Sequence, residues 1–186
     1  MEKIITNPDE INSCDALLVS GHSWLARIIQ KFERLAWNHA GLFMRLHVKT
    51  VINDVTYMPG LYVAEMVAKG LVLTDFDEYI MGKSHLLICR PTFPVDEQKY
   101  WEHIKPQLGK EKYGIINLIF CQPIKFLTNK RVWLGSLDEN PPRLICGEFV
   151  EREYHFFNSD IFTNWQRDAP SDIFADNHFE QYSFVR

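Results

Sequence analysis

The hydrophobic and polar positions follow two different periods along the chain, which predicts a mixture of strands and helices. Short apolar runs at residues 15–21, 39–44, 61–67 and 84–90 are bounded by turn residues and are typical of buried strands. Residues 24–36 carry apolar side chains at spacings of three and four, with charged side chains on the other face. This spacing predicts an amphipathic helix with Ser23 as its N-cap.

The middle of the chain predicts an antiparallel meander followed by short helices. Residues 47–56 are rich in Val, Ile and Thr around an Asn53-Asp54 turn, and Pro59-Gly60 marks a second turn. Residues 74–80 predict a short helix capped by Thr74, and residues 96–108 carry helical spacing. Residues 113–120 fit a buried helix or a strand equally well.

The C-terminal part predicts a helix after the Pro141-Pro142 pair, which ends the preceding loop at residues 135–142. This helix covers residues 145–157, and a short helix near residues 171–174 and a strand at residues 180–185 follow it. No internal repeat interrupts the pattern. We therefore expect one α+β domain spanning residues 1–186, with an antiparallel sheet packed against helices.

Composition and charge exclude several classes of protein. The 186 residues carry a net charge of −4, and Lys and Arg are spread rather than clustered, so no nucleic-acid partner is expected. The N-terminus lacks a secretory signal pattern, and no apolar run is long enough to form a transmembrane segment. We expect a soluble, cytoplasmic protein.

The four cysteines, at positions 14, 89, 121 and 146, show no C-x-x-C pairing, which argues against a zinc ribbon or a dithiol redox motif. Cys89 and Cys121 lie in apolar runs and are predicted to be buried structural thiols. Cys146 differs because it opens the predicted helix at residues 145–157. The unpaired N–H groups and the positive end of the helix dipole favour its thiolate.

A nucleophilic thiol also needs a base and a group that orients the base. His39 is the candidate base. Glu65 is the candidate orienting residue, since it interrupts the apolar run Val63-Ala64-Glu65-Met66-Val67, where a buried carboxylate requires a partner. From the residues alone, each has an ordinary alternative: His39 as a structural residue, Cys146 as core, and Glu65 as a solvent-facing side chain.

Seven short motifs, in their order along most of the chain, carry a family resemblance: Asp15-Ala16-Leu17-Leu18-Val19, the helix start at 23–30, Asn38-His39-Ala40-Gly41-Leu42, Val63-Ala64-Glu65, Tyr113-Gly114, Cys146-Gly147-Glu148-Phe149-Val150, and Ala169-Pro170-Ser171-Asp172. The chain resembles the circularly permuted branch of the NlpC-like papain-fold cysteine hydrolases, which includes YiiX-like proteins and is related to the lecithin retinol acyltransferase family. In this branch the histidine precedes the cysteine. Two positions depart from the pattern: Cys14 stands where Gly is usual, and Gly147 where Ser is common.

The resemblance implies a permuted papain-like fold with Cys146 as nucleophile, His39 as base and Glu65 as orienting residue. The expected activity is that of a cysteine hydrolase, a thiol protease or an acyltransferase that forms a thioester on Cys146. Its substrate would be an amide in a peptide or peptidoglycan fragment, or an acyl-lipid bond. The alternative is a non-catalytic lipid- or peptide-binding module, such as a viral or mobile-element accessory protein. No cofactor is expected.

Three further residues are candidates for binding substrate or the oxyanion. Gly147 keeps the backbone N–H that an oxyanion hole requires. Tyr113 would contribute if it lies near Cys146, and otherwise packs with its hydroxyl in water. His22 would line the cleft, although an exposed loop position is the simpler interpretation. No metal site is predicted from His22, His39, Glu65 and Cys146, because H-x-x-x-H and paired cysteines are lacking.

Overall fold

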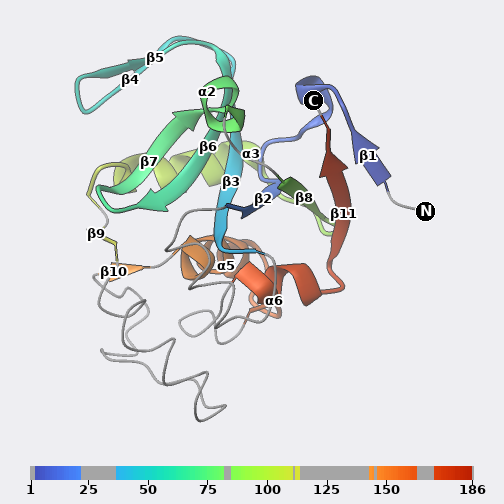
Figure 1. Cartoon of the computed structure of the whole chain (residues 1–186). Coiled ribbons are helices and arrows are strands. Elements are labelled where there is room, and N and C mark those ends of the chain that lie inside the picture. Colours follow the sequence, from blue (N-terminus) through green and yellow to red (C-terminus); the bar gives the residue numbers. More distant parts are fainter. Residues whose placement is uncertain are drawn as a thin grey trace.

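A seven-stranded sheet with the order β1-β11-β8-β2-β3-β6-β7 organises the computed structural model (Figure 1). The structure describes residues 3–21, 37–81, 85–110, 112–113, 143–144, 146–162 and 170–185. Neighbouring strands of this sheet are antiparallel except for β1 and β11, which pair in parallel. The strands are β1 (Lys3–Ile5), β2 (Ala16–Ser20), β3 (His39–Leu46), β6 (Gly60–Val67), β7 (Gly70–Asp75), β8 (His85–Pro91) and β11 (Phe179–Phe184).

Two short strand pairs lie outside this sheet. The hairpin of β4 (Thr50–Ile52) and β5 (Val55–Tyr57) projects from the far end of β3 and β6 (Figure 1). Its turn residues Asn53 and Asp54 have φ values of 48° and 63°, which Asn and Asp tolerate better than most residues. The second pair joins β9 (Lys112–Tyr113) to β10 (Arg143–Leu144) in parallel.

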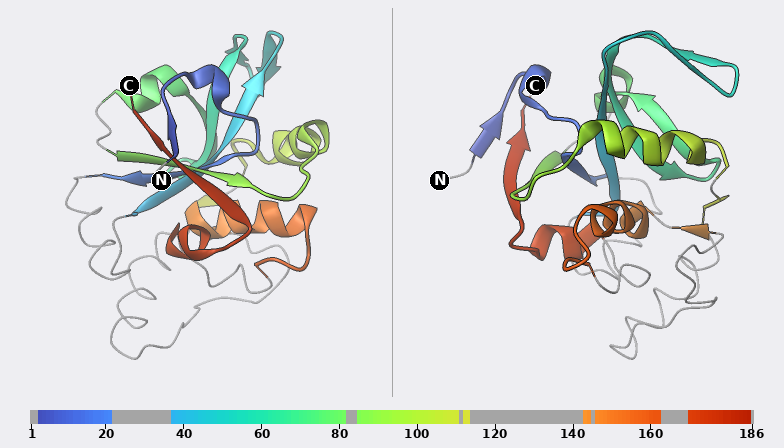
Figure 2. Two further views of the ribbon diagram at one scale, coloured as in Figure 1. Left: turned by 90° about the vertical axis from the view of Figure 1, so that its right-hand side faces the viewer. Right: turned by 180° about the vertical axis from the view of Figure 1, so that it is seen from behind.

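Helices cover both faces of the sheet (Figure 2). One face packs against α3 (Glu97–Ile104), α5 (Cys146–Phe157) and α6 (Pro170–Ala175), through a core that includes Leu18, Leu42 and Ala64. The opposite face carries α2 (Phe76–Ile80), over a second core that includes Leu17, Phe43 and Val63. The two cores follow from the alternation of side chains along each strand. Short 3-10 helices lie at Pro8–Glu10 (η1) and Lys105–Gln107 (η2).

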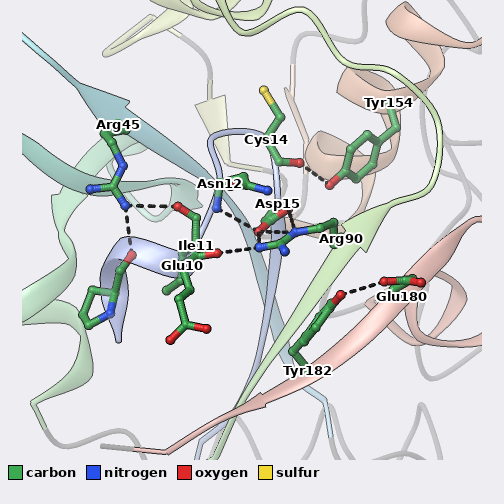
Figure 3. A network of polar contacts seen from close by, with 11 residues as sticks. Glu10, Ile11, Asn12, Cys14, Asp15, Arg45, Arg90, Tyr154, Glu180 and Tyr182 are labelled. Carbon is green, nitrogen blue, oxygen red and sulfur yellow. Dashed lines mark hydrogen bonds and ion pairs between the residues drawn. The ribbon is translucent and has the colours of Figure 1, made fainter. Parts of the chain in front are cut away.

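A polar network attaches the segment after β1 to the sheet (Figure 3). Nη2 of Arg90 on β8 lies 2.8 Å from Oδ2 of buried Asp15, and it also donates to the Glu10 carbonyl. Arg45 on β3 donates to the carbonyls of Pro8 and Ile11. These charge-assisted hydrogen bonds satisfy backbone carbonyls that no strand pairs, and they lie away from the start of β3.

The predicted α+β fold class is correct, and most predicted elements are confirmed. The strands near residues 15–21, 39–44, 61–67, 84–90 and 180–185 are present, as are the helices near 96–108, 145–157 and 171–174. The Asn53-Asp54 turn is confirmed as well. The predicted helix at 24–36 and the alternatives for residues 114–120 lie outside the described residues.

The helix predicted at residues 74–80 is wrong at its start. Thr74 belongs to β7, and the N-cap of α2 is Asp75, whose side chain accepts from the backbone N–H groups of Asp77 and Glu78. Aspartate caps a helix as well as threonine does, so adjacent candidates cannot be separated by propensity. The pairing of β6 with β7 decides between them, because it extends the strand through Asp75. Strands β1, β7 and β10 were not predicted.

Candidate active site

Cys146 is the first residue of α5, which packs against β3 and β6. Its side chain is buried, with only 5% of the residue exposed. The backbone N–H groups of Gly147 and Ala40 donate hydrogen bonds to its sulfur. Ala40 lies on β3, so the helix start is held against the strand that carries the candidate base, and two fixed donors favour a negatively charged sulfur.

His39 is the first residue of β3 and lies opposite Val19 of β2. The neighbouring Asn38 attaches this strand end to β2, since its backbone N–H donates to the Val19 carbonyl and its side chain bonds to the backbone of Gly21. The imidazole can reach Cys146 because it stands at the end of the strand, where α5 begins.

The His39 ring contacts Glu65 on the adjacent strand β6. Nε2 of His39 lies 2.5 Å from Oε2 of Glu65, whose side chain is only 8% exposed. A second hydrogen bond joins the ring to Cys146, and Nδ1 is the nitrogen left for it. A fixed carboxylate on one nitrogen therefore orients the other nitrogen toward the sulfur.

Gly41 provides the space for this contact. It pairs directly with Glu65, two residues beyond His39 on the same face of β3. A Cβ at position 41 would lie 2.6 Å from Cγ1 of Val63 and 3.4 Å from the Glu65 Cβ. A side chain larger than hydrogen would thus force β3 and β6 apart where their two functional groups meet.

The surroundings of Cys146 and His39 favour a thiolate paired with an imidazolium. Burial raises the pKa of the Cys146 thiol, but the charge and hydrogen bond of His39 outweigh it, so the pKa falls below its ordinary value of 9.0. Burial lowers the pKa of His39, whereas the charge and hydrogen bond of Cys146, followed by those of Glu65, raise it to about 10. Each group thus stabilises the charged form of the other.

The other described cysteines have the opposite character. Burial raises the pKa of the Cys89 thiol to about 12, and it also raises the pKa of Cys14. Both are free and buried, as predicted for Cys89. Cys121 lies outside the described residues. All three cysteines are buried, so burial does not distinguish Cys146 from Cys14 and Cys89. The difference is the charged His39 beside Cys146.

Sequence reasoning missed three residues around the pair. The backbone N–H of Ala40 contacts the sulfur, Oγ1 of Thr74 donates to Oε1 of Glu65 at 2.7 Å, and the hydroxyl of Tyr79 faces the same carboxylate. Of these, Thr74 was interpreted as a helix cap. The diagonal register of β6 and β7 that brings it to Glu65 has no signal in the sequence.

The secondary candidates are placed differently. Gly147 contacts the Cys146 sulfur through its backbone N–H. The backbone of Tyr113 forms β9, which pairs with the strand just before Cys146, and its side chain lies outside the described part of the chain. His22 also lies outside the described residues.

A cavity of about 710 Å³ opens beside the start of β3. Trp37 lines it two residues before His39, and Ser20 lines it one residue after the β2 partner of His39. Its wall combines apolar side chains of Leu87, Phe174 and Phe184 with polar side chains that include Lys3, His85 and Gln181.

Among the residues that the structure describes, no three His, Cys, Asp or Glu side chains are grouped as a metal site. The helices of the described segments are all too short or too polar to cross a membrane.

No protein-family model and no curated protein matches the chain. Its structure is similar to the crystal structure of the protein YiiX from Escherichia coli O157:H7, which is described as a metalloprotein. The two are 14% identical, with a TM-score of 0.59, and the alignment covers 91% of this chain and 95% of that one. The chain therefore has a YiiX-like α+β fold.

Proposed function

We propose that the protein is a cysteine hydrolase or acyltransferase that forms a thioester acyl-enzyme on Cys146. The observation that carries this proposal is the buried arrangement of Cys146, His39 and Glu65, in which the thiol pKa is lowered and the imidazole pKa is raised. A structural cysteine in an apolar core shows the opposite shift, as Cys14 and Cys89 do.

The first half of the reaction transfers the acyl group to sulfur. The Cys146 thiolate attacks the carbonyl carbon of an amide or ester and forms the C–S bond. The His39 imidazolium then gives its proton to the leaving nitrogen or oxygen as the bond to the leaving group breaks. Backbone N–H groups at the start of α5, including that of Gly147, are the donors that we assign to the developing oxyanion.

The second half regenerates the enzyme. The neutral His39 accepts a proton from water, or from an acceptor alcohol or amine, as this nucleophile attacks the thioester. The C–S bond breaks, the acyl group leaves as a carboxylic acid or as a new ester or amide, and the proton held by His39 restores the ion pair. Glu65 stays ionised throughout and orients the ring.

We assign the cavity near the start of β3 to an apolar acyl group or side chain of the substrate; Cys146, His39 and Glu65 are not among its lining residues, and Trp37 connects it to His39 along the chain. Trp37 and Phe174 have ring centroids 6.0 Å apart on its wall. This chemistry suits an acyl lipid or a peptide with an apolar residue next to the scissile bond, and the substrates predicted from the sequence include both.

A metal-dependent reaction fits these residues less well. The description of the E. coli protein as a metalloprotein belongs to that protein. In this chain His39 already bonds Glu65 through one ring nitrogen and Cys146 through the other, so a metal ion bound by His39 would have to displace one of these partners.

An activated ester tests the proposal directly. Incubation with p-nitrophenyl acetate, after treatment with EDTA, should add one acetyl group, and peptide mapping should locate it on Cys146. Cys146→Ser should abolish this adduct, whereas the matched variant Cys14→Ala should keep it. A folded protein that neither carries the acetyl group nor releases p-nitrophenol faster than Cys146→Ser does would overturn the proposal in favour of a binding module, as would acylation that survives in Cys146→Ser.

A further inference from the structure

Besides His39, the carboxylate of Glu65 accepts a hydrogen bond from Thr74, and its charge acts on the buried hydroxyl of Tyr79; both residues come from the segment formed by β7 and α2. Thr74 is the second-last residue of β7, and Tyr79 belongs to α2, which follows directly. The mechanism described above uses neither residue.

Strand register brings Thr74 to Glu65. Thr74 pairs with Val63, so its side chain lies on the same face of the sheet as Val63 and Glu65, diagonal to the carboxylate. Its Oγ1 donates to Oε1 of Glu65 at 2.7 Å, while Oε2 faces His39 at 2.5 Å. The two oxygens therefore have different partners, which fixes the rotation of the carboxylate.

Helix α2 brings Tyr79 to the same place. Phe76 anchors the helix through edge-to-face contacts with Phe43 of β3 and Phe184 of β11, with centroids 5.2 Å and 5.3 Å apart. Tyr79 lies three residues later on the same face of the helix and is only 4% exposed. Burial, followed by the charges of Glu65 and Cys146, raises the pKa of its hydroxyl, so the hydroxyl remains neutral and keeps its proton.

We propose that Thr74 and Tyr79 are positioning residues that keep the Glu65 carboxylate ionised and aimed at His39. This inference rests on the proposed function of the Cys146–His39 pair. Hydroxyl donors stabilise a carboxylate over a protonated carboxyl group, which burial would otherwise favour. Without these donors Glu65 would take up a proton at a higher pH, His39 would lose its anionic partner, and the Cys146 thiolate would be less stable.

Thr74→Val tests this chain of effects, because it keeps the size and β-branching of the side chain and removes the donor. The readout is the pH dependence of Cys146 alkylation by iodoacetamide, with melting curves to establish folding. We expect the midpoint to rise by about half to one pH unit, a fraction of the shift that one hydrogen bond to a charged group allows. Thr74→Ser should keep the parent midpoint, because serine retains the hydroxyl donor.

The matched controls are Thr56→Val on the exposed face of β5 and Tyr57→Phe, neither of which should move the midpoint. Tyr79→Phe should raise it in the same direction as Thr74→Val, and it provides the test if Thr74→Val fails to fold. A parent midpoint below 9.0 that neither Thr74→Val nor Tyr79→Phe shifts would overturn the positioning proposal alone. A parent midpoint at or above 9.0, the ordinary value of the thiol, would contradict the proposed function itself.

Discussion

His39 and Glu65 stand on adjacent antiparallel strands, and Nε2 of His39 lies 2.5 Å from Oε2 of Glu65. This contact uses one nitrogen of the ring and leaves the other for Cys146, at the start of α5. Two strands and one helix therefore meet at three side chains that are far apart in sequence. The charge relationship among them leads to the following predictions.

Cys146→Ser should separate chemistry from folding. The substitution exchanges one small side chain for another at a helix start, so the free energy of unfolding should change by no more than about 1.5 kcal/mol. Turnover of an ester substrate should fall by at least about a thousandfold, because serine lacks the low pKa of the thiol. Kinetics and denaturant unfolding on the same preparation check both. Parallel losses of stability and activity would indicate a structural role.

Glu65→Gln should act mainly on the alkaline side of the pH profile. The amide keeps an acceptor oxygen but loses the charge that helps to raise the His39 pKa to about 10. Because the reaction needs the imidazolium as acid, the alkaline limb of kcat/KM should lie near pH 10 in the parent. It should fall by about one to two pH units in the variant. An unchanged alkaline limb would show that Glu65 does not govern the ring.

Gly41→Ala should impair the site through geometry alone. The added Cβ meets Cγ1 of Val63 at 2.6 Å, so β3 and β6 must separate at the level of Glu65. We expect a loss of about 1–3 kcal/mol in the free energy of unfolding, together with a higher midpoint for Cys146 alkylation. Gly60→Ala is the matched control, since its Cβ would meet nothing closer than 3.5 Å. Equal effects of the two substitutions would contradict this reasoning.

The ion pair predicts a plateau of stability against pH. Below 9.0, the ordinary pKa of Cys146, and above both the lowered pKa of folded Cys146 and 6.5, the ordinary pKa of His39, the folded and unfolded pair each hold one proton, so their contribution does not change with pH. Above 9.0 the unfolded pair has lost its proton, while folded His39 keeps one up to about pH 10, so stability falls.

The plateau can be isolated by subtraction. The free energy of unfolding of the double variant Cys146→Ala/His39→Gln is subtracted from that of the parent at each pH. The contributions of the other titrating groups then cancel. This difference should decline between about pH 9 and 10 with a slope of up to about 1.4 kcal/mol per pH unit. A difference that is flat from pH 5 to 10 would mean that no ion pair forms.

The sequence predicts where each strand and helix lies along the chain better than it predicts which strands pair. β2, β3 and β6 are short apolar runs with clear turn residues, and α5 follows a proline pair, so local patterns suffice to locate them. Pairing across the chain has no local signal. β1 joins β11 in parallel over the full length of the sequence, and the end of β7 was assigned to a helix because Thr74 and Asp75 are both good caps.

The same distinction applies to the candidate site. Cys146, His39 and Glu65 stand out because a thiol at a helix start and a carboxylate in an apolar strand need an explanation. Their roles in catalysis stay predictions. Thr74 and Tyr79 are ordinary residues for a strand and a helix, and only register and the anchoring of Phe76 bring them to Glu65. Nothing in the sequence marks Gly41 either, and only its pairing with Glu65 shows why a glycine is needed there.

The most direct test of the thiolate–imidazolium pair is the alkylation rate of Cys146 against pH in the parent and in His39→Gln. Each cysteine is followed separately by peptide mapping, so Cys14 and Cys89 serve as internal references. Our account predicts a parent midpoint below 9.0, and a midpoint at or above 9.0 in His39→Gln, where burial acts on the thiol without an opposing charge. A folded His39→Gln protein with the parent midpoint would show that the two residues are uncoupled and would contradict the account.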